Sequence, residues 1–164
     1  WVATRSQTKP TDPGKLDQIV AGGQPAGLTL IDNVAKECFE EAGIPENLAG
    51  TARATGTVTY AMSTAERFRP DVLFVFDLEL PRDFIPVNTD GEVERFELWP
   101  VEHVLEVVRD TRRFKFNCAL VVIDFLVRHG VISPETPDYE QIVAGLRGRH
   151  TFLRTVRLPP GVTV

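Results

Sequence analysis

The chain has 164 residues, 43% of them hydrophobic, and carries 18 Lys plus Arg against 23 Asp plus Glu, a formal net charge of -5. A chain of this length buries about two thirds of the surface that its unfolded form exposes, so one compact domain is expected rather than two small cores. The acidic balance excludes a general electrostatic attraction to nucleic acid or to an anionic membrane, so any phosphate-bearing ligand must be attracted locally.

Strands and helices are predicted in a mixed order along the chain. Strands are expected at residues 1–6, 16–21, 51–62, 71–80 and 93–99. Helices are expected from Thr29 to Gly43 and at residues 101–109, 117–129 and 139–146. This order predicts an α+β protein, a layered α/β/α sandwich around a mixed sheet, rather than strict βα alternation. The predicted domain spans residues 1–146, and residues 147–164 form a basic tail.

The helix that follows the Gly-rich loop at residues 22–27 has the clearest signals. Thr29 and Asp32 have the spacing of a capping box at its start, and Gly43 supplies a stop at its end. Its apolar residues recur with helical period and form one stripe: Ile31, Val34, Ala35, Cys38 and Ala42. The stripe predicts which side of the helix packs against a sheet.

Three carboxylates share another side of the same helix. Glu37, Glu40 and Glu41 stand at i, i+3 and i+4, so they span about 100° of the helix face at the edge of the apolar stripe. Like charges at this spacing destabilise a helix unless a cation compensates them. Oxygen ligands of this kind suit Mg²⁺, which binds through one or two carboxylates together with substrate phosphates. A solvated acidic face is the alternative for an isolated cluster, but the capped helix and the preceding glycine loop favour a metal site.

The segment resembles the signature of the Nudix hydrolases: a glycine, five residues, a glutamate, seven residues, then Arg-Glu-apolar-x-Glu-Glu-x-Gly-apolar. The matching positions are Gly22, Glu37, Glu40, Glu41, Gly43 and Ile44. Three positions depart from it, since Leu28 replaces the first glutamate, Lys36 replaces the arginine and Cys38 fills an apolar slot. The first two departures put the rate and the substrate class in question.

Longer phrases resemble one Nudix subgroup, the proteins related to thiamin pyrophosphokinase. They are LDQIVAGGQPAG, AKECFEEAGIP, DLELPRDFIPVNTDGEVERFEL and FKFNCALVVIDFLVRHG. The resemblance implies a Nudix-like fold, a further domain that precedes this one, and hydrolysis of a thiamin diphosphate-like compound to its monophosphate. A nucleoside diphosphate-linked substrate of the ADP-ribose type stays open as an alternative, as does a ligand-binding module with little catalysis.

The resemblance also implies roles for single residues. Glu37, Glu40, Glu41 and the carbonyl of Ala21 would bind Mg²⁺ or Mn²⁺, which activates water and neutralises phosphate charge. The general base is expected to be Glu37 or a carboxylate of the later loop, where Glu92 is favoured over Asp90 and Glu94. Glu37, Glu41 and Glu92 are therefore the predicted catalytic residues.

Substrate-binding residues are predicted from residue type and position. Arg67 and Arg69 are expected to neutralise a substrate phosphate, and Tyr60, with Trp99 as the alternative, to stack on a heteroaromatic ring. The expected partner is a small-molecule diphosphate, with no nucleic acid and no membrane, and a homodimer is left open. Two cysteines in apolar patterns, Cys38 and Cys118, predict reduced thiols and a cytoplasmic setting.

Overall fold

Three short strands form the central sheet of the fold. They are β1 (Val2–Arg5), β2 (Leu16–Gln18) and β5 (Val93–Glu97), paired antiparallel in the order β2-β1-β5. The computed structural model describes residues 1–63 and 68–148 of the chain. All four residues of β1 are buried, so both faces of this sheet are covered by other elements.

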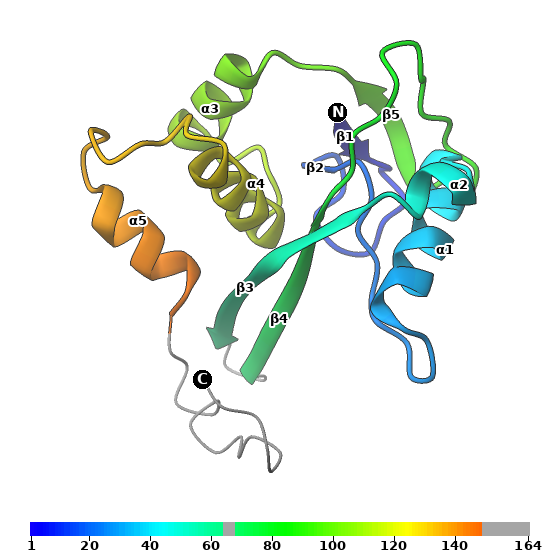
Figure 1. The fold of residues 1–164 in the computed structure, drawn as a ribbon, viewed down its shortest axis with the longest axis horizontal. Coiled ribbons are helices and arrows are strands. Elements are labelled where there is room, and N and C mark those ends of the chain that lie inside the picture. The colour runs from blue at the N-terminus through cyan, green and yellow to red at the C-terminus, as the bar shows by residue number, and fades with distance from the viewer. Residues whose placement is uncertain (64–67, 149–164) are drawn as a thin grey trace.

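Helices cover the two faces of the sheet (Figure 1). On one side lie α1 (Leu30–Ala42) and α2 (Glu46–Ala49), whose buried residues include Cys38 and Ala49. On the other side lie α3 (Val101–Asp110) and α4 (Phe116–Arg128), which pack against Val2 and Leu16 of the sheet. The layered α/β/α arrangement and the α+β class predicted from the sequence are therefore confirmed.

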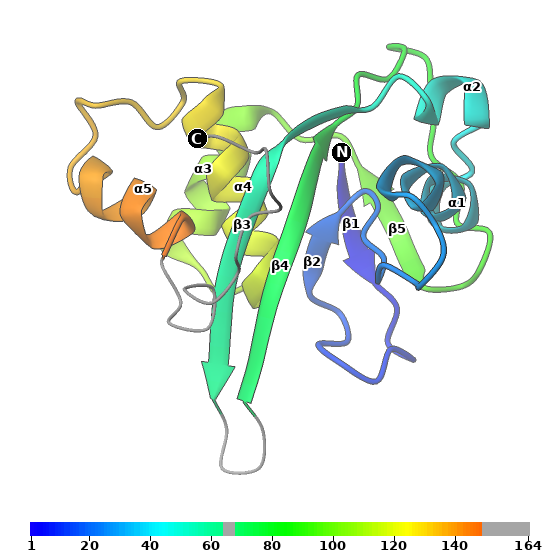
Figure 2. The same ribbon diagram turned by 60° about the horizontal axis from the view of Figure 1, so that its bottom comes forward.

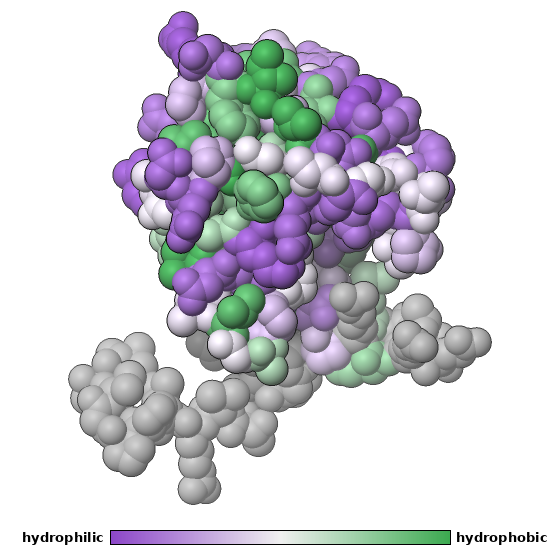
Figure 3. All heavy atoms as spheres, turned by 90° about the vertical axis from the view of Figure 1, so that its right-hand side faces the viewer, coloured by the Kyte–Doolittle hydropathy of each residue, from purple (hydrophilic) through white to green (hydrophobic). Residues whose placement is uncertain are grey.

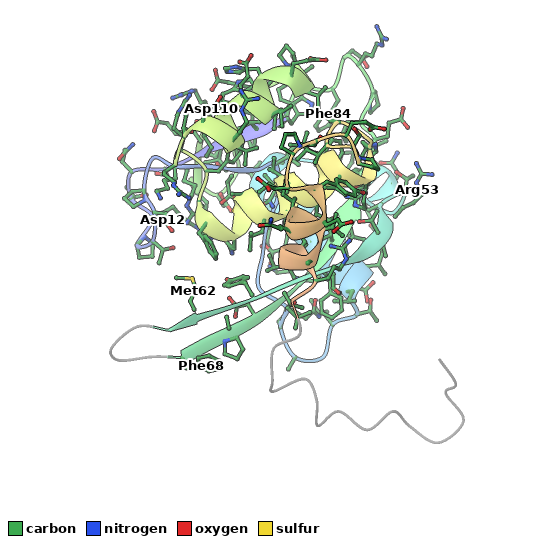
Figure 4. The ribbon with its side chains drawn as sticks, turned by 90° about the vertical axis from the view of Figure 1, so that its left-hand side faces the viewer. Asp12, Arg53, Met62, Phe68, Phe84 and Asp110 are labelled. Carbon is green, nitrogen blue, oxygen red and sulfur yellow. The ribbon has the colours of Figure 1, made fainter. Side chains whose placement is uncertain are left out.

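A long two-stranded ribbon stands beside this sandwich. β3 (Arg53–Ser63) and β4 (Phe68–Asp77) pair antiparallel, and one face of the pair packs through Val58 and Val75 on α4 and on α5 (Tyr139–Leu146). Figure 2 shows the ribbon crossing in front of α4. Met62 and Phe68 lie at its outer end, away from the helices (Figure 4), and their side chains are exposed.

The sequence predicts a mixed sheet, with parallel as well as antiparallel pairing, but the parallel pairing among the described residues is limited to a single bridge. Within the described residues, the strands of both sheets pair antiparallel, and the parallel contact is an isolated bridge between Leu16 and Phe114. The bridge does not lengthen into a strand because α4 begins at Phe116, where the backbone turns to its own helical hydrogen bonds. The predicted mixed sheet is corrected to two antiparallel sheets, with this bridge linking β2 to the segment between α3 and α4.

Helix α1 begins and ends where its sequence signals place it. The hydroxyl of Thr29 accepts the backbone N–H of Asp32 at 3.2 Å, and Gly43 adopts a left-handed conformation (φ 63°) as the C-cap. The predicted apolar stripe holds for the later turns, where Cys38 and Ala42 are buried. Ile31 in the first turn is instead exposed, because the buried cluster under α1 contacts only the turns that follow it.

The remaining predictions about organisation have mixed outcomes. Cys38 and Cys118 are free and buried, as expected for thiols used as core residues. Of the predicted basic tail, only residues 147 and 148 belong to the described part, and Arg147 makes an ion pair with Asp124 at 2.7 Å. No helix among the described residues is both long and apolar enough to cross a membrane.

Candidate functional site

The three carboxylates of α1 lie in three different environments. Glu41 is buried, with 9% of its surface exposed, whereas the side chains of Glu37 and Glu40 are 15% and 48% exposed. The difference follows from helix geometry, because Glu41 lies next to the apolar residues that face the sheet. The face of the molecule on which α1 and α2 lie shows hydrophilic side chains around smaller apolar areas (Figure 3). The row of carboxylates thus runs from solvent into the core.

Glu41 is held at the inner end of this row by the loop that precedes the helix. Its Oε2 accepts the backbone N–H of Ala21 at 2.8 Å. Burial raises the pKa of Glu41 to about 7, against the lowering effect of the Ala21 hydrogen bond, and the charges of Glu37, Asp17 and Glu92 raise it further. A cation placed beside Glu41 would relieve this accumulation of negative charge.

Gly22 is required by the position of Glu37. A Cβ atom added at residue 22 would lie 2.2 Å from Cδ and 2.5 Å from Oε1 of Glu37. The backbone of Gly22 is not in the left-handed conformation that favours glycine. The reason for glycine at this position is the close approach of the Glu37 side chain. The first glycine of the sequence motif therefore makes room for one of its carboxylates.

Lys36 takes the place of the motif arginine and pairs with the outer two carboxylates. Its Nζ lies 3.1 Å from Glu37 Oε1 and 2.6 Å from Glu40 Oε2. Its hydrogen bonds to Glu40, and then to Glu37, raise the pKa of Lys36. The lysine is exposed and carries one charge, so its pairing is easily exchanged for that of a stronger cation.

Glu41 of α1 and Glu92, which lies just before β5, line one small pocket. Its lining residues are Ala3, Arg5, Lys9, Asp17, Gln18, Glu41, Glu92 and Val93. Glu92 precedes β5 at the end of a loop that is fixed to the C-terminal end of α1, where Val87 N–H donates to Ala42 O at 3.0 Å and the Thr89 hydroxyl donates to Phe39 O at 3.3 Å. The structure therefore places two of the predicted catalytic residues, from separate elements, in one pocket.

Basic residues that the sequence analysis did not single out complete this pocket. Lys9 makes an ion pair with Glu92, and the Arg5 guanidinium donates to Asp17 Oδ2 at 2.7 Å. Asp17 also accepts from the thiol of Cys118 at 2.6 Å, so the pocket wall is tied to α4. The available signal was a pair of charged residues, Arg5 and Asp17, inside segments predicted as strands.

The predicted substrate-binding residues have separate outcomes. Tyr60 lies in β3, but only 7% of it is exposed and its hydroxyl bonds to Asp71, so its ring offers little surface to a stacking ligand. The edge of the Tyr60 ring meets Phe116, with centroids 5.6 Å apart. Arg67 lies outside the described residues. Arg69 lies in β4, and its side chain is outside the described part as well.

The predicted ligand set fits a hard divalent cation in its chemistry. Glu37, Glu40 and Glu41 supply oxygen donors, and Ala21 lies directly beside Glu41. The carboxylate oxygens do not point at one common position. Within residues 1–63 and 68–148, no group of three His, Cys, Asp or Glu is arranged so that it could hold a metal ion. Lys36 holds two of the carboxylates outward and Ala21 N–H holds the third inward. The oxygen donors are therefore present, and each carboxylate is hydrogen-bonded to another group of the chain.

Comparison with known protein families identifies the domain that carries these residues. The family model described as NUDIX domain matches residues 1–118, which include Gly22, all of α1 and Glu92. The chain belongs to the Nudix family. This confirms the family resemblance predicted from the sequence, and the match leaves the subgroup undecided.

Three curated relatives extend the comparison. The chain is 53% identical over 147 residues to "Nudix hydrolase 24, chloroplastic" of Arabidopsis thaliana, which covers 90% of this chain and 40% of the relative. It is 51% identical over 149 residues to "Nudix hydrolase 20, chloroplastic" of the same plant, covering 91% and 40%. An uncharacterized protein of Saccharomyces cerevisiae is 39% identical over 165 residues, covering 93% and 48%. The chain thus spans less than half the length of these relatives, two of which are named for the predicted enzyme class.

Proposed function

We propose that the chain hydrolyses a phosphoanhydride bond of a small organic diphosphate, with a divalent cation, and releases the monophosphate. The observation that carries this proposal is that Glu41 and Glu92 line one pocket. The carboxylate of Glu37, on the same helix as Glu41, occupies the space that Gly22 leaves free. A buried carboxylate such as Glu41, exposed to the charges of Glu37, Asp17 and Glu92, is a costly arrangement that a functional cation would compensate.

The positions of the residues suggest which of them would hold the metal ion and which would act as the general base. Glu37, Glu40, Glu41 and the Ala21 carbonyl would hold Mg²⁺ or Mn²⁺, which when bound supplies charge neutralisation at the phosphates and a more acidic water. Glu92 would accept the proton of that water, and its ion pair with Lys9 holds its carboxylate in the pocket wall. Glu37 is the alternative general base, because it lies on the same edge of α1 as Glu40 and Glu41.

The substrate class follows from the resemblance and from the local charges. We propose a thiamin diphosphate-like compound, on the phrases that resemble the proteins related to thiamin pyrophosphokinase. Arg5 and Lys9 of the pocket are paired with the carboxylates of Asp17 and Glu92, so a divalent cation would supply the local attraction for an anionic diphosphate. The net charge of -5 disfavours nucleic acid or an anionic membrane as the ligand. A cytoplasmic location and a homodimer stay predictions; two of the relatives carry the word chloroplastic in their names.

A substrate panel tests the reaction class. Thiamin diphosphate, ADP-ribose and related nucleotide diphosphates would be incubated with and without Mg²⁺, and the products identified by chromatography. We expect a monophosphate product that requires the metal, and a loss of about 100-fold or more in kcat for Glu41→Gln. The control is Glu102→Gln, which removes an exposed carboxylate from α3 and is expected to keep full activity.

Three results would contradict parts of the proposal. Full activity in the presence of a chelator would exclude the metal mechanism. Turnover of ADP-ribose without turnover of thiamin diphosphate would exclude the thiamin-like substrate and favour the nucleotide alternative. Binding of metal and diphosphate by calorimetry, with no product after long incubation, would show a ligand-binding module, as the Leu28 and Lys36 departures allow.

A further inference from the structure

An exposed aromatic ring lies at the start of α4, next to the strand that lines the pocket. Phe116 is the first residue of the helix, and 51% of it is exposed. The preceding backbone N–H, of Lys115, donates to Leu16 O in β2 at 2.9 Å. One turn later, the Cys118 thiol donates to Asp17 at 2.6 Å. The first turn of α4 is thus fixed to the same strand that contributes Asp17 and Gln18 to the Glu41 pocket.

The Phe116 ring is supported from one side by a buried aromatic residue. Tyr60 of β3 meets it at an interplanar angle of 86°, an edge-to-face contact. Tyr60 is itself buried, and because the two rings are nearly perpendicular it covers at most one face of the Phe116 ring. The ribbon and α4 therefore hold the Phe116 ring between them, at a helix start that is bonded to the strand lining the pocket.

The other aromatic candidate near the helices is already covered. The Trp99 ring lies 4.6 Å from the His103 ring, and the Arg113 guanidinium lies 5.7 Å from its centroid. The indole ring thus already contacts two residues of this chain. Phe116 differs because the one ring contact described for it is edge-on, which leaves a face open.

We propose that Phe116 determines substrate specificity by stacking on a planar heteroaromatic group of the diphosphate. The inference rests on the proposed function and names the part of the substrate that lies outside the pocket. An aromatic ring in this place favours diphosphates of flat ring systems over those of alkyl groups, because every flat ring offers a π-face to it. Tyr60, which was predicted to stack, acts instead as the positioning residue behind Phe116.

Kinetics with paired substrates test this assignment. Phe116→Leu, Phe116→Trp and the control Phe74→Leu would be assayed with thiamin diphosphate and with butyl diphosphate. Phe74 is a matched control because it is 52% exposed and lies on the opposite face of the ribbon from Tyr60. We expect Phe116→Leu to raise KM for the aromatic diphosphate about 10-fold, with kcat and the butyl diphosphate KM within two-fold. Phe116→Trp should restore the low KM.

Binding measurements separate this inference from the proposed function. Calorimetric titration with thiamin monophosphate reports ring recognition without turnover, and Phe116→Leu should weaken it about 10-fold. Equal effects of Phe116→Leu and Phe74→Leu, or an equal change for both substrates, would overturn the Phe116 assignment while leaving the hydrolase intact. A wild-type protein that hydrolyses butyl diphosphate but binds no thiamin monophosphate would overturn it too. Absence of any hydrolysis would overturn the proposed function alone, provided that Phe116-dependent ring binding remains.

Discussion

The two adjacent glycines before α1 differ in what surrounds them. Gly22 lies against the Glu37 carboxyl group, whereas a Cβ at Gly23 would meet no atom within 4 Å. Neither glycine has a left-handed backbone, so a methyl group added at either position acts through contact alone. The pair therefore allows a clean test of the Gly22–Glu37 approach.

We expect Gly22→Ala to displace the Glu37 carboxylate and to weaken Mn²⁺ binding by about 10- to 100-fold, the usual effect of losing a group that orients a metal ligand. The measurement is Mn²⁺ titration followed by electron paramagnetic resonance. Gly23→Ala is the matched control and should bind Mn²⁺ like the wild type. Equal affinities for both variants would show that Glu37 adjusts without cost.

Glu41 makes the stability of the metal-free protein depend on pH. Its pKa in the folded chain is raised to about 7 from an ordinary value of 4.5, chiefly by burial. The folded state therefore holds the proton more tightly than the unfolded state. The stability from this group is fully present below about pH 4.5 and is lost as pH rises through about 7.

In chelator, we expect the free energy of unfolding of the wild type to fall by up to about 3 kcal/mol between these pH values, relative to Glu41→Gln. Urea unfolding at several pH values measures it. The fall should shrink when Mg²⁺ is present, because a bound cation favours the ionised carboxylate. A pH dependence that Glu41→Gln leaves unchanged would assign the effect to another group.

At the scale of elements, the end of α1 depends on a left-handed residue. Gly43 has φ 63°, and its N–H donates to Phe39 O at 3.1 Å, which satisfies a terminal carbonyl of the helix. The same helix end holds the loop that delivers Glu92, through Val87 and Thr89. A change at this cap therefore affects both the helix and the loop.

We expect Gly43→Ala to lower the free energy of unfolding by about 1 kcal/mol, because alanine is strained in this conformation. Gly145→Ala is a control that should change the free energy of unfolding in the opposite direction. Gly145 lies within α5 with no atom near the position of an added Cβ, so alanine should raise the free energy of unfolding by up to about 1 kcal/mol. Thermal unfolding of both variants checks the pair. A stabilised Gly43→Ala would show that the cap is not as strained as its backbone angle indicates.

At the scale of the molecule, one arginine connects the ribbon to the helical layer. Arg128 of α4 binds Asp77 of β4 through two nitrogens, at 2.6 and 2.8 Å, and binds the buried Asp124 at 2.7 Å. Arg147 pairs with the other oxygen of Asp124. The hydrogen bonds from Arg128 lower the pKa of Asp77, so this contribution to stability is present at neutral pH and lost as pH falls.

We expect Arg128→Leu to destabilise the fold by about 2 to 3 kcal/mol, because it leaves Asp124 buried with Arg147 as its remaining partner. Arg109→Leu, which breaks an exposed pair with Asp110, should change the free energy of unfolding much less than Arg128→Leu does. Urea unfolding compares them. Similar losses for the two variants would mean that the Asp77 and Asp124 contacts add nothing beyond a surface ion pair.

The sequence by itself determined the limits of α1, its caps and the shared face of its three glutamates. These features depend on residues within one or two turns of each other, so local spacing is sufficient to predict them. The departure of Lys36 from the motif was also visible, and the structure shows which carboxylates it binds. The class of fold followed from the order of the predicted elements.

Only the tertiary structure decided how each of these side chains is placed. It buried Glu41 and left Glu40 half exposed, brought Lys9 to Glu92 across 83 residues, and covered Tyr60 while leaving Phe116 open. Burial, and the pKa that follows from it, depend on neighbours from distant parts of the chain, which no periodic pattern records. The chemical groups of the site were therefore encoded locally, and their environment was set by packing.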